Sequence, residues 1–291
     1  MQTEQIGKLL RVGGAAATVG VITCVHAAAE QMPLGQIMAG RAAVSGVLIL
    51  IYGMIFMPRR DLLPNHWQQH LFRGALACAG MLLSYIAFAT LPVAQAQTLL
   101  FLAPLIAVPL AAVRLRERLS PKVLIGLGLG FVGMLLILGT SFDLGPLAAW
   151  GAICGMAAAF VVAVIQVTIR AMMATETAIS TALSFTLIVA LVSAVSVFWG
   201  DWIWPQGSLL WVLIASGVFG ALNLVLFAES LARASVTTLA PLDYTALIWA
   251  LMADWLIFAV RPNGLSLMGS VLITIGALVV VLRSREKPVP V

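Results

Sequence analysis

Four carboxylates lie within long apolar runs of the sequence: Glu30, Glu229, Asp243 and Asp254. An ionisable side chain at membrane depth is costly unless it is paired or has a function, so each is a functional candidate, although Glu30 and Glu229 lie near helix ends and are interpreted as interfacial. Asp243 lies about eight residues into the run 235–260, roughly 12 Å along a helix axis and so near the middle of a bilayer. We expect Asp243 to bind a substrate ammonium group or to carry a proton; a buried ion pair or a hydrogen-bonded cap is the structural alternative.

Two further ionisable side chains are candidates for proton coupling beside Asp243. Asp254 follows Asp243 by three helical turns, so the two would share one face of a helix; an ion pair with Arg41 is its structural alternative. His26 has an ordinary pKa near neutrality, which suits a protonation switch, although a packing role is the alternative. The predicted proton-coupling candidates are therefore His26, Asp243 and Asp254.

Aromatic and uncharged polar side chains of the apolar runs predict a pocket that combines aromatic surface with a few hydrogen-bonding groups. Such a lining suits amino acids and other amphiphilic metabolites better than sugars or inorganic ions. Helix–helix hydrogen bonding is the alternative for the polar members, to which Gln166 and Thr245 also belong. The predicted substrate-binding residues are Tyr85, Gln97, Thr98, Phe101, Phe160, Asn223, Asp243, Tyr244 and Trp249.

The elements that position these residues must be transmembrane helices. Of the 291 residues, 62% are hydrophobic and 9% are charged, against about 25% charged residues in an ordinary soluble domain. Lipid offers no hydrogen-bond partners, and the runs are too long for barrel strands, so an all-α integral membrane fold with ten helices is predicted. The expected spans are 9–30, 36–57, 70–91, 93–113, 121–140, 146–170, 178–200, 208–231, 235–260 and 265–283.

The positions of the basic residues predict the orientation of these spans. With ten helices, all of the 16 lysines and arginines except Arg41 and Arg261 fall at or near one side of the membrane. The positive-inside rule makes that side cytoplasmic, together with both ends of the chain. The basic residues are therefore interpreted as orienting signals, Lys8 and Arg11 among them, and not as a nucleic-acid site.

An internal repeat divides the chain into residues 1–140 and 141–291. Positions in the third and fourth predicted helices recur in the eighth and ninth at a constant shift, and two glycines of the fifth recur in the tenth after a three-residue insertion. Because each half has five helices, the second half would be inverted relative to the first. The matching pairs are Gly80 and Gly220, Leu82 and Leu222, Leu91 and Leu231, Ala94 and Ala234, Thr98 and Thr238, Leu99 and Leu239, Gly126 and Gly269, and Gly133 and Gly276.

Two segments of the first half, 91–105 and 116–121, resemble the EamA-type drug/metabolite transporter pattern, and 234–244 echoes it in the second half. The chain departs from the pattern at 258–261, where such proteins often carry a Gly-Glu pair. The acidic residue of the pattern is therefore present in the first half only, as Glu117. The resemblance implies a central cavity lined by helices 1, 3, 4, 6, 8 and 9. It also implies a bacterial inner-membrane location and, as the nearest branch, the exporters of amino acids, aromatic ones included.

Other motifs have structural interpretations. The string 128–133 matches GxGxxG, but no strand precedes it, so we expect Gly126 and Gly130 to contact a neighbouring helix instead. Pro104, Pro109 and Pro241 are expected to interrupt hydrogen bonding inside spans. Metal, nucleotide and hydrolase motifs do not occur in the sequence. We therefore expect no cofactor, no metal and no enzymatic activity.

Taken together, these features predict a secondary transporter that exports small organic metabolites, amino acids foremost, by alternating access through a cavity between the repeats. The expected partners are a small-molecule substrate and the lipid bilayer, without nucleic acid; the oligomeric state stays open, a monomer included. One alternative is an importer of another metabolite, such as a vitamin or a nucleotide-derived compound. Alternatives from other classes are an intramembrane lipid-modifying enzyme and a non-transporting assembly or sensor subunit.

Overall fold

The computed structural model describes residues 2–29, 31–90, 99–117, 119–138, 146–198, 201–256 and 264–282. Every regular element in these segments is helical, as predicted. Among the described helices, six are long and apolar enough to cross a membrane, and three shorter apolar helices accompany them. Many large apolar side chains face outward, where lipid would cover them in a bilayer.

In the described part of the first half, the chain forms five long helices and one short 3₁₀ turn. The first helix starts at residue 2, not 9. Of the fourth expected span, 93–98 lie outside the described residues, 99–100 are helical, and α5 begins at residue 103 after a turn. The bounds are α1 (Gln2–Ala29), α2 (Leu34–Phe56), η1 (Arg59–Leu62), α3 (Trp67–Thr90), α5 (Ala103–Arg114) and α6 (Pro121–Leu138).

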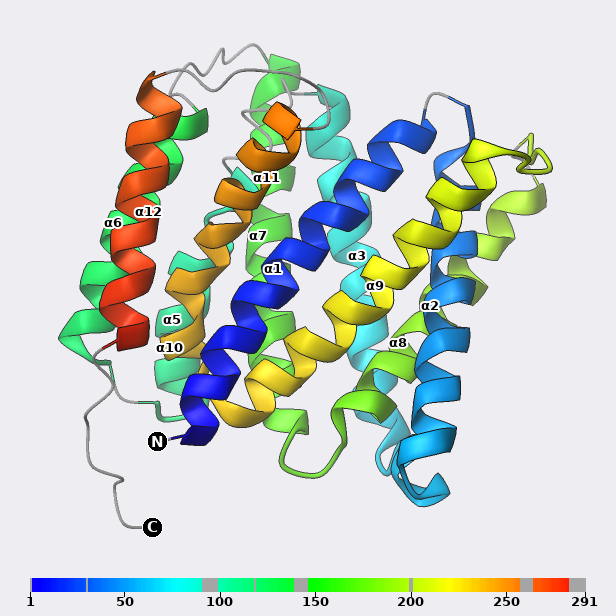
Figure 1. The fold of residues 1–291 in the computed structure, drawn as a ribbon, viewed down its shortest axis with the longest axis horizontal. Helices are drawn as coiled ribbons and strands as arrows, with labels where there is room; N and C mark the ends of the chain where they lie inside the picture. The colour runs from blue at the N-terminus through cyan, green and yellow to red at the C-terminus, as the bar shows by residue number, and fades with distance from the viewer. Residues whose placement is uncertain are drawn as a thin grey trace.

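The described part of the second half follows the expected spans closely. Three consecutive short elements between residues 236 and 256 together form one interrupted span. With these counted as one, the described residues form ten helical spans, which confirms the predicted number; Figure 1 shows their arrangement. The bounds are α7 (Pro146–Met172), α8 (Ala178–Ala194), η2 (Val195–Phe198), α9 (Ser208–Arg233), α10 (Val236–Leu239), η3 (Ala240–Tyr244), α11 (Thr245–Leu256) and α12 (Gly264–Leu282).

The ninth span is interrupted at Pro241. Proline has no N–H and disfavours the α conformation before it, and here one turn of α10 gives way to the 3₁₀ segment η3 before α11 resumes the helix. Asp243 lies in this segment, and the expectation that Pro241 interrupts its span is confirmed. The expectation for Pro104 is wrong, because Pro104 lies in the first turn of α5, where a helix loses no hydrogen bond to proline.

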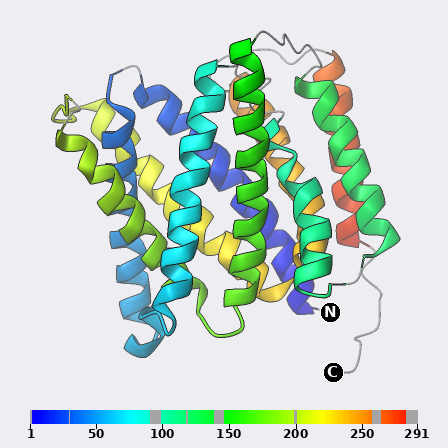
Figure 2. The ribbon, with the colours of Figure 1, turned by 180° about the vertical axis from the view of Figure 1, so that it is seen from behind.

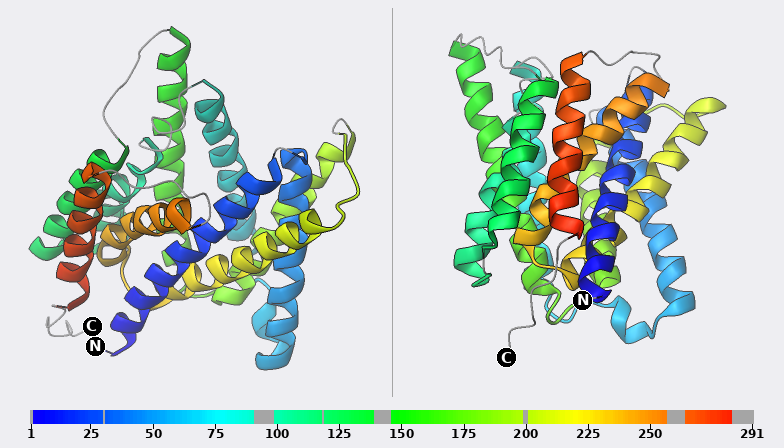
Figure 3. Two further views of the ribbon diagram at one scale, coloured as in Figure 1. Left: turned by 45° about the horizontal axis from the view of Figure 1, so that its top comes forward. Right: turned by 60° about the vertical axis from the view of Figure 1, so that its left-hand side comes forward.

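The four most extensive helix–helix contacts are α1 with α9, α6 with α12, α3 with α7, and α2 with α8. Figure 1 shows α1 and α9 side by side across the bundle, and Figure 2 shows α3 and α7 on the opposite side. The start of α1 and the end of α12 lie at the same end of the bundle (Figure 1). In Figure 3, α6 and α12 form a pair at one edge, while α11 lies between this pair and α1.

The α6–α12 pair is held at close range by glycines. A Cβ atom added to Gly133 would lie 2.6 Å from the carbonyl oxygen of Gly269, and one added to Gly276 would lie 2.9 Å from that of Gly126. Small residues allow such contacts between membrane helices. The expectation that Gly126 contacts a neighbouring helix is therefore confirmed.

Candidate functional site

A buried ion pair joins α1 to the interrupted ninth span. Arg11 donates from Nε to Oδ1 of Asp243 at 2.5 Å and from Nη2 to Oδ2 at 2.8 Å. The side chain of Arg11 is 1% exposed and that of Asp243 is 19% exposed. Two-point hydrogen bonding of this kind offsets part of the large cost of taking both charges out of water. The ion pair, which was the structural alternative to substrate or proton binding by Asp243, is thus present. The carboxylate of Asp243 nevertheless remains partly accessible.

Two more helices support this pair. Gln166, on α7, donates from Nε2 to Oδ2 of Asp243 at 3.2 Å. The guanidinium carbon of Arg11 lies 3.8 Å from the ring centroid of Phe227 on α9, which is a close cation–π contact. The pair is therefore fixed by side chains from α1, α7, α9 and η3, which come from both halves of the sequence.

A cavity of about 230 Å³ lies beside the ion pair. Its polar lining consists of Arg11, Thr18, Gln166 and Asp243, while the rest is mostly apolar or aromatic and includes Phe101 and Phe227. A mostly apolar pocket with a few convergent polar groups is the usual form of a small-molecule site. Phe101 and Asp243, two of the predicted binding residues, are thus brought together at one cavity.

Asn223 reaches the same cavity through Thr18. Its Nδ2 donates to Oγ1 of Thr18 at 2.5 Å and to the carbonyl oxygen of Gly14 at 3.1 Å, and the Thr18 hydroxyl donates to that carbonyl at 3.0 Å. Asn223 therefore forms an α9–α1 hydrogen bond, the alternative given for the polar candidates, and orients a lining residue of the cavity.

Tyr244 lies behind the cavity wall. Its side chain is fully buried, and its ring stacks on that of Phe101 with centroids 6.2 Å apart. A Cβ atom at Gly130 would lie 2.3 Å from this ring, so Gly130 makes room for Tyr244. The structure therefore places Tyr244 where it supports Phe101.

The remaining predicted residues are more dispersed. Trp249 lines a separate cavity of about 200 Å³ with Val12 and Thr245, and the side chain of Phe160 is 51% exposed on α7. Gln97 and Thr98 lie outside the described residues. The helices of three further candidates are described but their side chains are not: these are Tyr85 on α3, His26 on α1 and Asp254 on α11.

Sequence reasoning missed the role of Arg11. With α1 expected to begin at residue 9, Arg11 was interpreted as an orienting residue at the membrane surface; with α1 beginning at Gln2, it lies in the third turn and is buried. Lys8 is buried too, and its Nζ donates to the carbonyl oxygen of Val280 at 2.9 Å. The sequence contains one signal for this pairing. A carboxylate at membrane depth is expected to pair with a cation, and Arg11 is among the few charged residues inside an apolar helix.

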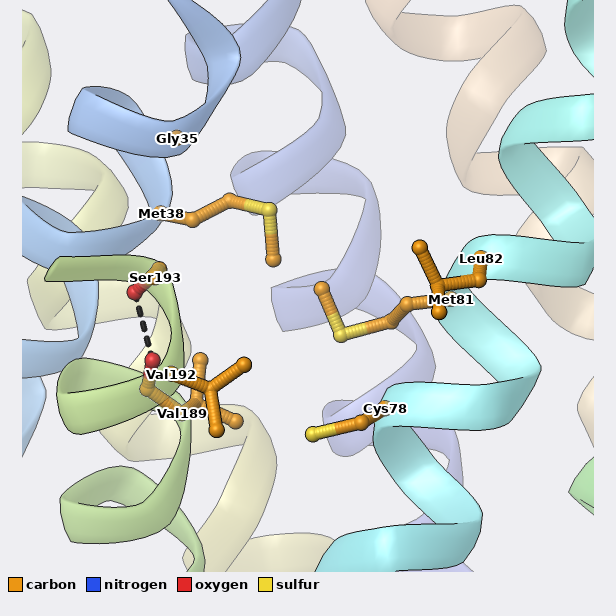
Figure 4. Close-up of a pocket in the computed structure, with 8 residues that line it drawn as sticks. All are labelled: Gly35, Met38, Cys78, Met81, Leu82, Val189, Val192 and Ser193. Carbon is orange, nitrogen blue, oxygen red and sulfur yellow. Dashed lines mark hydrogen bonds between the residues drawn. The ribbon is translucent and has the colours of Figure 1, made fainter. Parts of the chain in front are cut away.

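A second pocket, of about 210 Å³, lies between α2, α3 and α8 (Figure 4). Met38 and Met81 reach toward one another across it, and Cys78 lies beside Met81. The hydroxyl of Ser193 is bonded to the carbonyl oxygen of Val189 within the same helix at 2.5 Å. Because its lining has no polar group free to orient a substrate, the cavity at Asp243 is the better candidate.

Glu117 caps the start of the interrupted ninth span, α10, which lies toward the end of the bundle where α1 begins (Figure 1). Its two carboxylate oxygens accept hydrogen bonds from the backbone N–H groups of Val236 at 3.1 Å and Thr237 at 2.9 Å. A carboxylate at a helix N-terminus satisfies N–H groups that have no partner within the helix. Glu117 therefore holds α10 in place; the segment 258–261 of the second half lies outside the described residues.

Glu176 has a similar role between α7 and α8, which sequence reasoning did not find. Its carboxylate accepts hydrogen bonds from the backbone N–H groups of His66 at 2.7 Å and Asn65 at 3.1 Å, just before α3. Burial acts to raise the pKa of Glu176, but these two hydrogen bonds and the contact with His70 outweigh it and lower the pKa. The carboxylate therefore stays ionised and fastens the α2–α3 loop.

Comparison with known proteins identifies relatives over nearly the whole chain. The EamA-like transporter family matches residues 5–139 and again residues 149–282. A riboflavin transporter of Vibrio cholerae is 27% identical over 272 residues, which cover 92% of this chain and 89% of the relative. A pseudopaline exporter of Pseudomonas aeruginosa is 26% identical over 255 residues, 87% and 88% of the two chains.

A solved structure has the same fold. A crystal structure aligns with a TM-score of 0.84 and 21% identity, over 96% of this chain and 97% of the other. With the family and the candidate spans, this similarity describes a multi-pass membrane protein of a family that transports small molecules. The family and relatives are transporters, which favours transport over the enzymatic alternative.

Proposed function

The chain belongs to the EamA-like transporter family, and from that premise we propose a secondary transporter that binds a small organic metabolite at the Arg11–Asp243 cavity. One observation carries the proposal: a cavity of about 230 Å³ lies beside an ion pair at a break in a membrane helix. Interrupted helices near the midplane are where secondary transporters place their sites. We further propose a bacterial inner-membrane location with both ends of the chain cytoplasmic.

Alternating access is proposed because the halves 1–140 and 141–291 pack as inverted repeats would. The family matches the chain once in each half. Each helix of one half can be replaced by the helix at the same place in the other half, so that α1 exchanges with α7, α2 with α8, α3 with α9 and α6 with α12. The pair α1–α9 then becomes α7–α3, which also packs closely, and the pairs α2–α8 and α6–α12 stay the same. This invariance is what a pseudo-two-fold axis between the halves requires.

The glycine contacts between α6 and α12 obey the same exchange. The sequence repeat aligns Gly126 with Gly269 and Gly133 with Gly276. Exchanging aligned residues turns the Gly126–Gly276 contact into the Gly269–Gly133 contact, and both are close backbone approaches. These contacts support a passage between two related halves that rock against each other.

The substrate proposed is a small organic molecule without net charge, because Arg11 and Asp243 neutralise each other at the cavity. Zwitterionic amino acids belong to this class, and amino-acid export is the first substrate and direction that we propose. The similarity to a riboflavin transporter favours a second candidate, the import of a vitamin.

Counterflow in proteoliposomes tests the proposal. Purified protein is reconstituted into liposomes loaded with unlabelled phenylalanine, tryptophan or riboflavin, and uptake of the same compound in tritiated form is measured. We expect Asp243→Asn, which leaves Arg11 without a counter-charge, to abolish counterflow. The matched control is Asp201→Asn, which makes the same chemical change at an exposed residue and should leave uptake unchanged. Counterflow at the wild-type rate by Asp243→Asn would contradict the assignment.

A further inference from the structure

Two polar atoms of the cavity residues have no hydrogen-bond partner among the described residues. They are Nη1 of Arg11 and Oε1 of Gln166, both buried. Both side chains line the cavity and are otherwise engaged, because their remaining polar nitrogens all contact Asp243. A buried donor or acceptor without a partner is costly, so a ligand that satisfies both atoms would gain from each contact.

The side chains that carry these two atoms are anchored to one carboxylate oxygen. Oδ2 of Asp243 accepts from Nη2 of Arg11 at 2.8 Å and from Nε2 of Gln166 at 3.2 Å. In Arg11, Nη1 and Nη2 are attached to the same carbon, and in Gln166, Oε1 and Nε2 are attached to the same carbon. Each unpartnered atom is therefore two covalent bonds from a nitrogen that donates a hydrogen bond to Oδ2. The cavity therefore presents one donor and one acceptor from groups with a common anchor.

The charge balance of the site favours a neutral ligand group. The charges of Arg11 and Asp243 cancel, the carboxylate already accepts three hydrogen bonds, and the Thr18 hydroxyl donates to a backbone carbonyl. A substrate ammonium has three N–H groups, and among the described side chains that line the cavity Oε1 of Gln166 is the buried acceptor without a partner. Burying a charge with so few partners is unfavourable.

We propose that the cavity recognises an amide edge: a neighbouring C=O and N–H of a lactam, imide or ureide. The carbonyl oxygen accepts from Nη1 of Arg11, the N–H donates to Oε1 of Gln166, and the attached ring lies against apolar lining such as Phe101 and Pro104. This inference rests on the proposed function and, among its substrates without net charge, selects neutral molecules that carry such an edge over zwitterionic amino acids.

Two probes that differ in a single N–H test this recognition. Isoquinolin-1(2H)-one, a lactam with a single N–H beside its C=O, has the edge, and its N-methyl derivative has the same ring without the N–H. We expect the full-length protein in detergent to bind the first about 5- to 150-fold more tightly by calorimetry, the range for leaving a buried acceptor unpaired. In Gln166→Met this ratio should fall to about one, because the acceptor is gone. In the control Gln36→Met, whose glutamine bonds to Ile203 instead, the ratio should persist.

The outcomes separate this inference from the proposed function. Equal binding of the two probes by the wild type, no binding of either, or an undiminished ratio in Gln166→Met would overturn the amide edge. Phenylalanine binding more tightly than both probes, and losing affinity in Asp243→Asn, would overturn the amide edge while supporting the proposed function. Undiminished counterflow in Asp243→Asn would instead count against the proposed function.

Discussion

Removing one partner of the Arg11–Asp243 pair should cost about 3–5 kcal/mol of unfolding free energy, because the other charge is left buried. The two single variants should differ. Asp243→Leu leaves Arg11, which is 1% exposed, and should lie at the upper end; Arg11→Met leaves Asp243, which is 19% exposed and partly hydrated, and should lie at the lower end.

The double variant Arg11→Met/Asp243→Leu leaves no charge behind and should cost much less than the sum of the single variants. We expect a coupling energy of about 2 kcal/mol or more, within the range for contacting residues. The assay is equilibrium unfolding in mixed micelles of increasing SDS fraction, followed by circular dichroism.

A second pair on the bundle provides the control. Glu229 and Arg233, one turn apart on α9, form an ion pair that is more exposed. The same cycle with Glu229→Gln and Arg233→Met should give a coupling energy of only about 0.2–1 kcal/mol. If the Arg11 and Asp243 variants were additive, or coupled no more strongly than this control, the claim of a buried, interdependent pair would be refuted.

Three further predictions concern contacts that stabilise the fold: the packing of Tyr244 and the hydrogen bonds accepted by Glu176 and Glu117. Gly130→Ala, which places a Cβ atom 2.3 Å from the Tyr244 ring, should lower the thermal midpoint, and adding Tyr244→Leu should restore part of it; no change in the single variant would contradict the contact. Burial acts to raise the pKa of Glu176, but hydrogen bonds lower it overall, so its stabilisation is complete above the unfolded pKa of about 4.3 and is lost as the pH falls through the folded value. The unfolding midpoint should therefore fall more steeply with acidification in the wild type than in Glu176→Gln, and parallel curves would refute this. Glu117→Gln should cost about 1 kcal/mol of unfolding free energy, the usual size of a helix cap, whereas the control Asp201→Asn should cost almost nothing.

Most of the fold follows from the sequence because the membrane leaves few choices. Apolar runs bounded by charged residues, proline and glycine predicted ten spans, and Pro241 predicted the break in the ninth. The start of α1 was not predicted, because a charged residue such as Lys8 normally ends a membrane span. Here the helix continues past Lys8, since the Val280 carbonyl oxygen accepts a hydrogen bond from it, as Asp243 does from Arg11 one turn later.

Predicting which helix faces meet the cavity was harder. A soluble helix shows its buried face by its polarity, but a membrane helix is apolar toward both lipid and protein. Phe160 and Gln166 lie on the same helix, and the first is half exposed while the second is buried at the cavity. The pairing of Arg11 with Asp243 joins distant parts of the chain, which helix periodicity alone does not reveal.

Alternating access requires a cavity at Asp243 that opens to one side of the membrane at a time. Ala246, which lines it, can be changed to cysteine after Cys24, Cys78 and Cys154 are replaced by serine. A membrane-impermeant maleimide should then label Ala246→Cys from either side of sealed vesicles, with the favoured side reversing when the gradient of the substrate found by counterflow is reversed. Labelling from the same single side under both gradients would contradict it.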